Sequence, residues 1–149
     1  MSRVVHEVEI QSTPERIYEI SQDYALRYQW DPFPEKIEFL DGATALQVGT
    51  RVRVTAKSGL VMDVEYVQYS PPGVAAIKMT SGPAVLRNFA GSWQFKALAN
   101  GNTRAIFKYS IRTKTWTIRL VSEPLAAWYF GRHVRVRLDR LKRYCEGGV

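Results

Sequence analysis

Residues 86–115, LRNFAGSWQFKALANGNTRAIFKYSIRTKT, have the pattern of two long β-strands joined by a tight turn. Apolar or small residues occupy every second position from Phe89 to Phe95 and again along 104–115, which predicts that each strand buries one face. The segment Asn100-Gly101-Asn102 between them favours a β-hairpin turn. The positions that share the apolar face are Phe89, Gly91, Trp93, Phe95, Ala105, Phe107, Tyr109 and Ile111.

The same alternation extends the predicted sheet toward the N-terminus. Turn residues such as Ser58-Gly59 and Ser70-Pro71-Pro72-Gly73 separate the strands, and consecutive strands joined by tight turns form an antiparallel sheet. Asp63 and Glu65 are expected on the solvent face, opposite two basic residues of the preceding strand, Arg51 and Arg53. The additional strands are predicted at residues 3–10, 36–40, 50–57, 61–69 and 74–80.

Two short helices are predicted after the first strand. Thr13 before Pro14 is typical of a helix N-cap with proline at the first helical position, and Ser12 with Glu15 is an alternative capping box. Residues 24–30 can form a second helix, which Asp31-Pro32-Phe33-Pro34 ends because proline disfavours helix in the residue before it.

A long amphipathic helix is predicted at the C-terminus. Ser122-Glu123-Pro124 is expected to open it and Gly147-Gly148 to end it. Its polar face is rich in arginine and lysine. Its apolar stripe, at steps of three and four residues, consists of Ala127, Phe130, Val134, Leu138, Leu141 and Cys145.

The order of elements predicts an α+β fold in which a curved antiparallel sheet wraps around the C-terminal helix. One helical stripe cannot cover a large sheet completely, and a twisted sheet that curls around it tends to leave space. We therefore expect a single helix-grip domain spanning residues 1–149, with an internal cavity lined by bulky apolar side chains and a few tyrosines. Such a cavity suits an apolar ligand with one or two polar groups.

Composition excludes several classes of protein. With one cysteine, Cys145, the chain has no internal disulfide, and His6 and His133 lie too far apart in sequence to suggest a metal site, so we expect neither metal nor cofactor. No apolar run approaches the roughly 20 residues of a membrane span or resembles a secretory signal, and we expect a cytoplasmic protein. The net charge of +7 allows nucleic-acid or anionic-membrane binding. However, the basic helix lacks interleaved stacking aromatics, and we expect neither nucleic acid nor stable membrane insertion.

The chain resembles the START-like (SRPBCC) superfamily, and within it the polyketide cyclase/dehydrase group. The resemblance is carried in family order by STPERIYEI after the first strand, YQWDPF, VGTRVRV, GSWQF, TRAIFKYSI and the terminal LDRLKRY. It implies a helix-grip fold around a ligand cavity. Members of the group bind lipids, hormones, quinones or polyketides, and some cyclise or dehydrate a bound polyketide. The group has no universal catalytic motif, so the resemblance transfers no catalytic residue.

Several residues are candidates for ligand contact. Tyr66 and Tyr109 share the apolar face of their strands, and each hydroxyl is expected either to bond backbone or water or to hold a ligand oxygen. Arg87 falls in phase with Phe89 if the strand has no bulge, and otherwise reaches water. Trp93 and Phe95 pack the core or contact the ligand. The complete predicted set is Tyr66, Arg87, Phe89, Trp93, Phe95, Phe107, Tyr109, Phe130 and Val134.

Two titratable residues and one apolar group have alternative interpretations. Asp31 is expected to be a turn residue, with a general base at the cavity entrance as the alternative, and His133 is expected to be solvated rather than catalytic. Leu125, Trp128 and Tyr129 lie off the apolar stripe, so they form a lid, a homodimer contact or a membrane contact, unless neighbouring strand ends cover them.

The favoured function is binding of a hydrophobic small molecule, such as a lipid, a quinone or a polyketide-like compound. The alternative is a polyketide cyclase or dehydratase that acts on such a ligand. Catalysis needs convergent acid–base groups inside the cavity, and the sequence offers only tyrosines, Arg87 and Asp31. We therefore rank binding ahead of catalysis.

Overall fold

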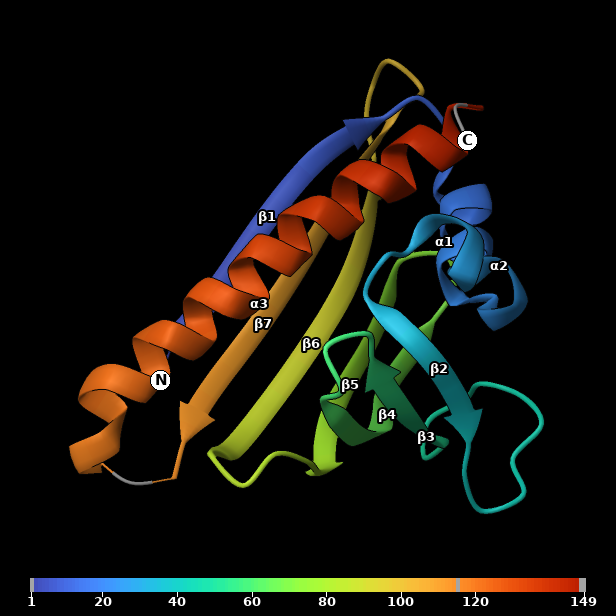
Figure 1. The fold of residues 1–149 in the computed structure, drawn as a ribbon. Coiled ribbons are helices and arrows are strands. Elements are labelled where there is room, and N and C mark those ends of the chain that lie inside the picture. The colour runs from blue at the N-terminus through green and yellow to red at the C-terminus, as the bar shows by residue number, and fades with distance from the viewer. Residues whose placement is uncertain (1, 115, 148–149) are drawn as a thin grey trace.

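The computed structural model describes residues 2–114 and 116–147, and the side chains of residues 116–122 are excluded from the description. One seven-stranded antiparallel sheet, in the order β1-β7-β6-β5-β4-β3-β2, carries two short helices and one long helix (Figure 1). The strands are β1 (Ser2–Ile10), β2 (Pro34–Phe39), β3 (Arg51–Ala56), β4 (Val61–Ser70), β5 (Val74–Ser81), β6 (Leu86–Ala97) and β7 (Thr103–Thr113). The helices are α1 (Pro14–Gln22), α2 (Tyr24–Trp30) and α3 (Trp116–Cys145).

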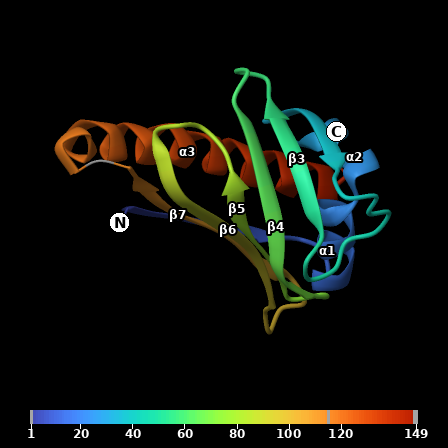
Figure 2. The same ribbon diagram turned by 90° about the horizontal axis from the view of Figure 1, so that it is seen from below.

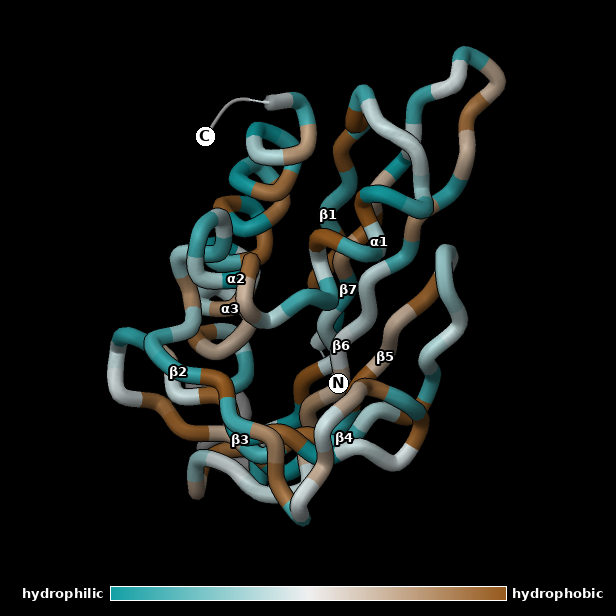
Figure 3. The backbone as a smooth tube through the Cα atoms, turned by 90° about the vertical axis from the view of Figure 1, so that its right-hand side faces the viewer, coloured by the Kyte–Doolittle hydropathy of each residue, from teal (hydrophilic) through white to brown (hydrophobic). Residues whose placement is uncertain are grey.

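The sheet bends around α3 as the helix-grip prediction requires. Strands β1 and β7 run beside α3 and pack against it (Figure 1). Seen from below, β3 and β4 instead run across the direction of the helix (Figure 2). In the side view the sheet curls round until β2 lies on the same side of the molecule as α3 (Figure 3). Only one half of the sheet is therefore covered directly by the helix.

The core fills the layer between α3 and the strands beside it. The predicted stripe is buried from Phe130 to Cys145, and Val134, Leu138 and Leu141 are completely inaccessible to solvent. They meet Ile10 of β1 and Ile111 of β7, which are equally inaccessible. Burying a side chain of this size stabilises the fold by roughly 1.5–3 kcal/mol relative to exposure.

The short helices begin where the sequence predicts. Thr13 is the N-cap of α1, because its Oγ1 accepts a hydrogen bond from the backbone N–H of Arg16 at 3.3 Å, and Pro14 follows in the first turn. Asp23 caps α2, with its Oδ1 2.9 Å from the N–H of Ala25. The capping box of Ser12 and Glu15 is not the arrangement adopted.

Strand pairing confirms the predicted pairing of acidic with basic residues, but Asp63 is buried rather than on an open solvent face. Arg51 lies opposite Glu65, and Arg53 lies opposite Asp63 in the β3–β4 register. The guanidinium of Arg53 makes two hydrogen bonds to the Asp63 carboxylate, at 2.8 and 3.1 Å. The pKa of Asp63 is lowered, mainly by these hydrogen bonds.

The start of the long helix was predicted wrongly. The helix begins at Trp116 rather than at residues 122–124, and Pro124 lies inside it. Ser-Glu-Pro is a helix-opening pattern, but proline forbids only its own backbone hydrogen bond and crowds one preceding turn. A helix can therefore continue through Pro124 when its other residues are packed. Among the described helices, none is both long and apolar enough to cross a bilayer.

Candidate functional site

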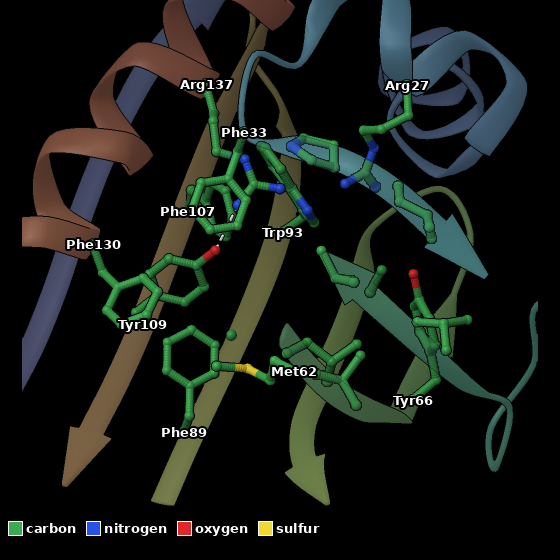
Figure 4. Close-up of a pocket in the computed structure, with 18 of the residues that line it drawn as sticks. Arg27, Phe33, Met62, Tyr66, Phe89, Trp93, Phe107, Tyr109, Phe130 and Arg137 are labelled. Carbon is green, nitrogen blue, oxygen red and sulfur yellow. Dashed lines mark hydrogen bonds between the residues drawn. The ribbon is translucent and has the colours of Figure 1, made fainter. Parts of the chain in front are cut away.

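A pocket lies between the concave side of the sheet and α3 (Figure 4). The enclosed space is about 90 Å³. Leu60 and Phe130 also line an open groove of about 410 Å³, so the two spaces adjoin at these side chains. The pocket is lined by Tyr24, Arg27, Phe33, Pro34, Ile37, Val52, Val54, Leu60, Met62, Val64, Tyr66, Ala75, Ile77, Phe89, Gly91, Trp93, Phe107, Tyr109, Phe130 and Arg137.

An aromatic wall from β6, β7 and α3 forms one side of the pocket. Trp93 and Phe107 are paired across the two strands, and their ring centroids lie 3.7 Å apart. Phe89 lies 4.6 Å from Tyr109 and 4.8 Å from Phe130 by the same measure. The alternation along the β6–β7 hairpin therefore supplies the strand side chains of this wall.

Gly91 makes room for one of these rings. It lies opposite Tyr109 in the β6–β7 register, and a Cβ atom at residue 91 would come within 2.7 Å of the Tyr109 ring. Real Cβ atoms essentially never approach so closely. A glycine in the middle of this strand therefore allows the tyrosine ring to lie flat across it.

A buried ionic cluster closes the inner end of the pocket. Asp31, at the end of α2, is 2% exposed, and Arg137 of α3 and Arg27 of α2 are each 6% exposed. Arg137 Nη2 lies 2.9 Å from Asp31 Oδ2, and Arg27 Nη1 lies 3.4 Å from the same oxygen. Burial alone would lower the pKa of Arg137, but Asp31 and Tyr109 raise it above its ordinary value. Arg137 is therefore charged at every accessible pH.

Asp31 combines two functions. Its Oδ1 accepts a hydrogen bond from the backbone N–H of Phe33 at 3.0 Å, which is the turn function predicted from the sequence. Both carboxylate oxygens also accept from Arg137 Nε, at 3.0 and 3.1 Å. The carboxylate thereby joins α2 to α3 through a contact between residues 106 positions apart in the chain.

The two predicted tyrosines have side-chain partners rather than the expected backbone or water. The Tyr109 hydroxyl accepts from Arg137 Nη1 at 2.6 Å. The Tyr66 hydroxyl lies 2.6 Å from that of Tyr24 and donates to Gln22 Oε1 at 3.0 Å. Burial is the main cause that raises the pKa of both Tyr66 and Tyr109. Both hydroxyls therefore stay protonated at neutral pH.

Three of the predicted contact residues lie outside the pocket lining. Arg87 is exposed, because the β6–β7 register shifts between Leu86 and Asn88 and turns its side chain to solvent. Phe95 is buried beside Tyr18, with ring centroids 6.1 Å apart. Val134 is enclosed in the packed core under α3. The pocket lining includes the other six: Tyr66, Phe89, Trp93, Phe107, Tyr109 and Phe130.

The sequence analysis missed Arg27 and Arg137. Arg137 lies seven residues after Phe130 and four before Leu141, so it falls within the apolar stripe of α3. A charged residue at such a position signals a buried partner, and the acidic candidate was Asp31. Arg27 lies three residues from both Tyr24 and Trp30, so it too is a charged residue on the apolar face of its helix, the shorter α2.

His133 lies at the edge of the pocket among aromatic rings. Its ring centroid is 5.0 Å from that of Phe33 and 4.5 Å from that of Tyr129. Burial, and then the positive charges of Arg137 and Arg132, lower its pKa below the ordinary value. The side chain is half-buried, which corrects the expectation that it is simply solvated.

The groove next to the pocket carries the predicted apolar group. Leu125 is 60% and Trp128 is 64% exposed, whereas Tyr129 is half-buried and its hydroxyl lies 2.8 Å from Ser58 Oγ. The guanidinium of Arg132 lies 5.9 Å from the Trp128 ring centroid. Neighbouring strand ends therefore cover only Tyr129 of the three.

Metal-binding chemistry has no candidate site in the described ranges. No group of three or more histidine, cysteine, aspartate or glutamate side chains gathers there in a way that could hold an ion. The buried Cys145 thiol has a pKa raised to about 11, mainly by burial. It is therefore a core residue rather than a reactive group.

The chain is similar to one known protein family and to several solved structures. A family model described as polyketide cyclase/dehydrase and lipid transport matches residues 1–146. XoxI from Bacillus cereus has a similar structure, with 14% identity, a TM-score of 0.78 and coverage of 97% of this chain and 95% of that one. An aromatase/cyclase from a Streptomyces species, Zhui, has 18% identity, a TM-score of 0.77 and 99% coverage of each chain.

A third similar structure is the di-domain ARO/CYC BexL. It has 22% identity and a TM-score of 0.76, and the match covers 97% of this chain and 50% of that one. No curated protein matches the sequence. At these identities the solved structures establish the shared fold.

Proposed function

The chain belongs to the polyketide cyclase/dehydrase and lipid transport family, and from this premise we propose that it binds an apolar small molecule in the pocket beneath α3. Lipids, quinones and polyketide-like compounds are the ligand classes that suit the pocket. The observation that carries the proposal is an enclosed space with an almost wholly apolar and aromatic lining. A ligand gains roughly 25 cal/mol for each Å² of apolar surface that such a lining removes from water.

The groove extends the space available to a ligand. The enclosed part, about 90 Å³, suits the inner end of a molecule, whereas the adjoining groove offers about 410 Å³. Phe130 and Leu60 stand between the two spaces. A ligand longer than the enclosed part would therefore displace these two side chains and lay its remaining apolar length in the groove.

A cyclase or dehydratase activity on such a ligand is the second candidate. The Tyr109 hydroxyl and the Arg137 guanidinium lie together at the pocket, and such donors can stabilise negative charge that develops on a substrate oxygen. The carboxylate of Asp31, however, already accepts from Arg137, Arg27 and the Phe33 N–H. Among the described lining residues no carboxylate faces the pocket as a base, which favours binding over catalysis.

A pocket-filling substitution tests the binding proposal. Val64 lines the pocket from β4, whereas Val67 on the same strand is 44% exposed and lies outside the lining. We expect Val64→Phe to weaken saturable binding of the uncharged fluorescent dye N-phenylnaphthylamine by about tenfold, which corresponds to roughly 1.4 kcal/mol. The matched control Val67→Phe should leave the dissociation constant unchanged. Failure of the dye to bind, or an equal effect of both variants, would refute the proposal.

Turnover distinguishes the second candidate from the first. Native mass spectrometry of the purified protein should show a small molecule that leaves unchanged when the protein unfolds. An enzyme would instead convert a polyketide-like substrate, and Tyr109→Phe would lower the rate more than it lowers dye affinity because the hydroxyl acts on the developing charge. Conversion that persists undiminished in Tyr109→Phe would remove Tyr109 from the catalytic candidates.

A further inference from the structure

The inner end of the pocket carries an unbalanced positive charge (Figure 4). Two buried guanidinium groups, Arg27 and Arg137, face one buried carboxylate, Asp31. Among the described residues that line the pocket, the two arginines are the only ones with a charged side chain. The nearby His133 adds no charge at neutral pH, since burial and Arg137 lower its pKa. One positive charge is thus left without a counter-charge in apolar surroundings.

The two guanidinium groups also keep unused hydrogen-bond donors. An arginine has five N–H groups. Arg27 donates from Nε and Nη2 to the Ser21 carbonyl oxygen and from Nη1 to Asp31. Arg137 donates from Nε and Nη2 to Asp31 and from Nη1 to Tyr109. In the described part of the chain, one N–H on each terminal nitrogen of both arginines therefore has no acceptor.

The Tyr109 hydroxyl adds another donor at the same place. It accepts from Arg137 Nη1, and its own hydrogen has no acceptor within the described ranges. Figure 4 shows this hydroxyl and the Arg137 guanidinium directed toward one another beside Phe107 and Trp93. The guanidinium carbons of Arg27 and Arg137 lie 6.0 and 5.7 Å from the Trp93 ring centroid, so donors from β7, α2 and α3 line the same part of the pocket.

The surroundings of the donors are aromatic. The Arg137 guanidinium carbon lies 4.9 Å from the ring centroid of Phe33 and 5.0 Å from that of Phe107. A guanidinium matches a carboxylate with two parallel hydrogen bonds, and flat aromatic walls favour a flat apolar body. A bound anion would supply the missing counter-charge and the missing acceptors together.

We propose that the pocket is specific for an apolar acid: a planar, apolar ligand whose single carboxylate or comparably acidic oxygen group binds Arg27, Arg137 and Tyr109. The inference rests on the proposed binding function and names the chemical class of the ligand. Asp31 orients Arg137 through three hydrogen bonds and contacts Arg27 at 3.4 Å, and its single negative charge leaves one of the two positive charges for the ligand.

A matched pair of competitors tests this specificity at pH 7. Naphthoate and naphthylmethanol have the same ring system, and only naphthoate carries a charge. Each is titrated against the wild-type protein loaded with N-phenylnaphthylamine. We expect naphthoate to displace the dye at about a tenfold lower concentration than naphthylmethanol, because charge-assisted hydrogen bonds to a buried guanidinium are roughly twice as strong as neutral ones.

Variants of Arg27 locate the effect. Arg27→Met removes the unbalanced charge while Asp31 and Arg137 remain paired, and it should abolish the preference for naphthoate without abolishing dye binding. Arg27→Lys keeps the charge and should retain most of the preference. Arg87→Met is the control for net charge, since Arg87 is exposed and outside the pocket, and it should behave like the wild type.

The outcomes separate this inference from the binding proposal. If the dye does not bind the wild-type protein, the binding proposal fails first. If the dye binds but the wild-type protein prefers naphthylmethanol, or shows no preference between the two competitors, the acid specificity is overturned. An equal loss of preference in Arg27→Met and Arg87→Met overturns it as well. Should Arg27→Met fail to unfold cooperatively, the wild-type preference and its retention in Arg27→Lys still decide the question.

Discussion

The two halves of the sheet have the same alternating pattern, but only one of them is packed solidly. Beneath α3 the core is solid, and its completely buried side chains include Ile10, Ile111 and Leu138. In the other half, Met62 and Ile77 point to the same concave side and line a pocket. The difference arises because α3 packs against β1 and β7, whereas β3 to β5 curve away from it.

This comparison shows that alternation predicts which face of a strand is buried and not what covers it. The same type of apolar residue fills the core in the packed half and lines a pocket in the other half. The ionic cluster of Asp31, Arg27 and Arg137 lies at the transition between them, because Arg137 belongs to α3 and also lines the pocket. Substitutions in the cluster and in each half test this division, and the largest expected effect comes first.

Loss of the carboxylate at the boundary should be the most damaging change. Asp31→Ala leaves two buried guanidinium groups without a counter-charge, and breaking a buried ion pair in this way costs about 3–5 kcal/mol. Urea denaturation at pH 7 measures the loss. The matched control is Asp139→Ala, whose pair with Arg143 is at least half exposed and should contribute less than about 1 kcal/mol. Similar losses in both variants would contradict a cluster that holds α2 against α3.

Truncation of apolar side chains should differ between the halves. Leu138→Ala creates a cavity in the packed half and should lower the free energy of unfolding by about 3 kcal/mol. Met62→Ala enlarges space that already exists and should cost about 1–2 kcal/mol, near or below the lower end of the range for such substitutions. Only Met62→Ala should also change the affinity for N-phenylnaphthylamine. Equal stability losses and unchanged affinity would show that the halves are packed alike.

The smallest effect concerns pH. The pKa of His133 is lowered in the folded protein, mainly by burial and then by Arg137, so the unfolded chain binds more protons below about pH 6.5. Stability should therefore fall as the pH drops below this value and should be constant above it. His133→Gln should flatten the decline in urea midpoints between neutral and mildly acidic pH. His6, whose pKa is lowered chiefly by burial in β1, makes its own contribution, and His6→Gln measures it.

Most of the fold was predictable because its signals are local. Thr13 and Pro14 mark a helix start by their own backbone chemistry, and the residues around Gly101 mark a turn. Local signals also explain the error at the long helix. Ser-Glu-Pro at 122–124 has the chemistry of a helix start, but α3 already includes these residues.

The candidate site was only partly predictable. Five aromatic side chains of the pocket, Tyr66, Phe89, Trp93, Phe107 and Tyr109, follow from strand alternation, and Phe130 follows from the helical stripe of α3. Arg87 shows the limit of this reasoning, because one shift in register turned it to solvent. Arg137 was overlooked although its helical spacing placed it on the apolar stripe of α3. An arginine is usually assigned to a polar face until its partner is known.

The amino-acid sequence by itself determined the elements, their order and the apolar face of each strand and helix, because turn chemistry and residue spacing act over a few neighbouring positions. Only the tertiary structure decided that the Arg137 guanidinium meets the Asp31 carboxylate, 106 residues away in the chain. That contact depends on how far the sheet curves and where α3 crosses it. Both depend on the packing of all the strands together, which no short segment of sequence contains.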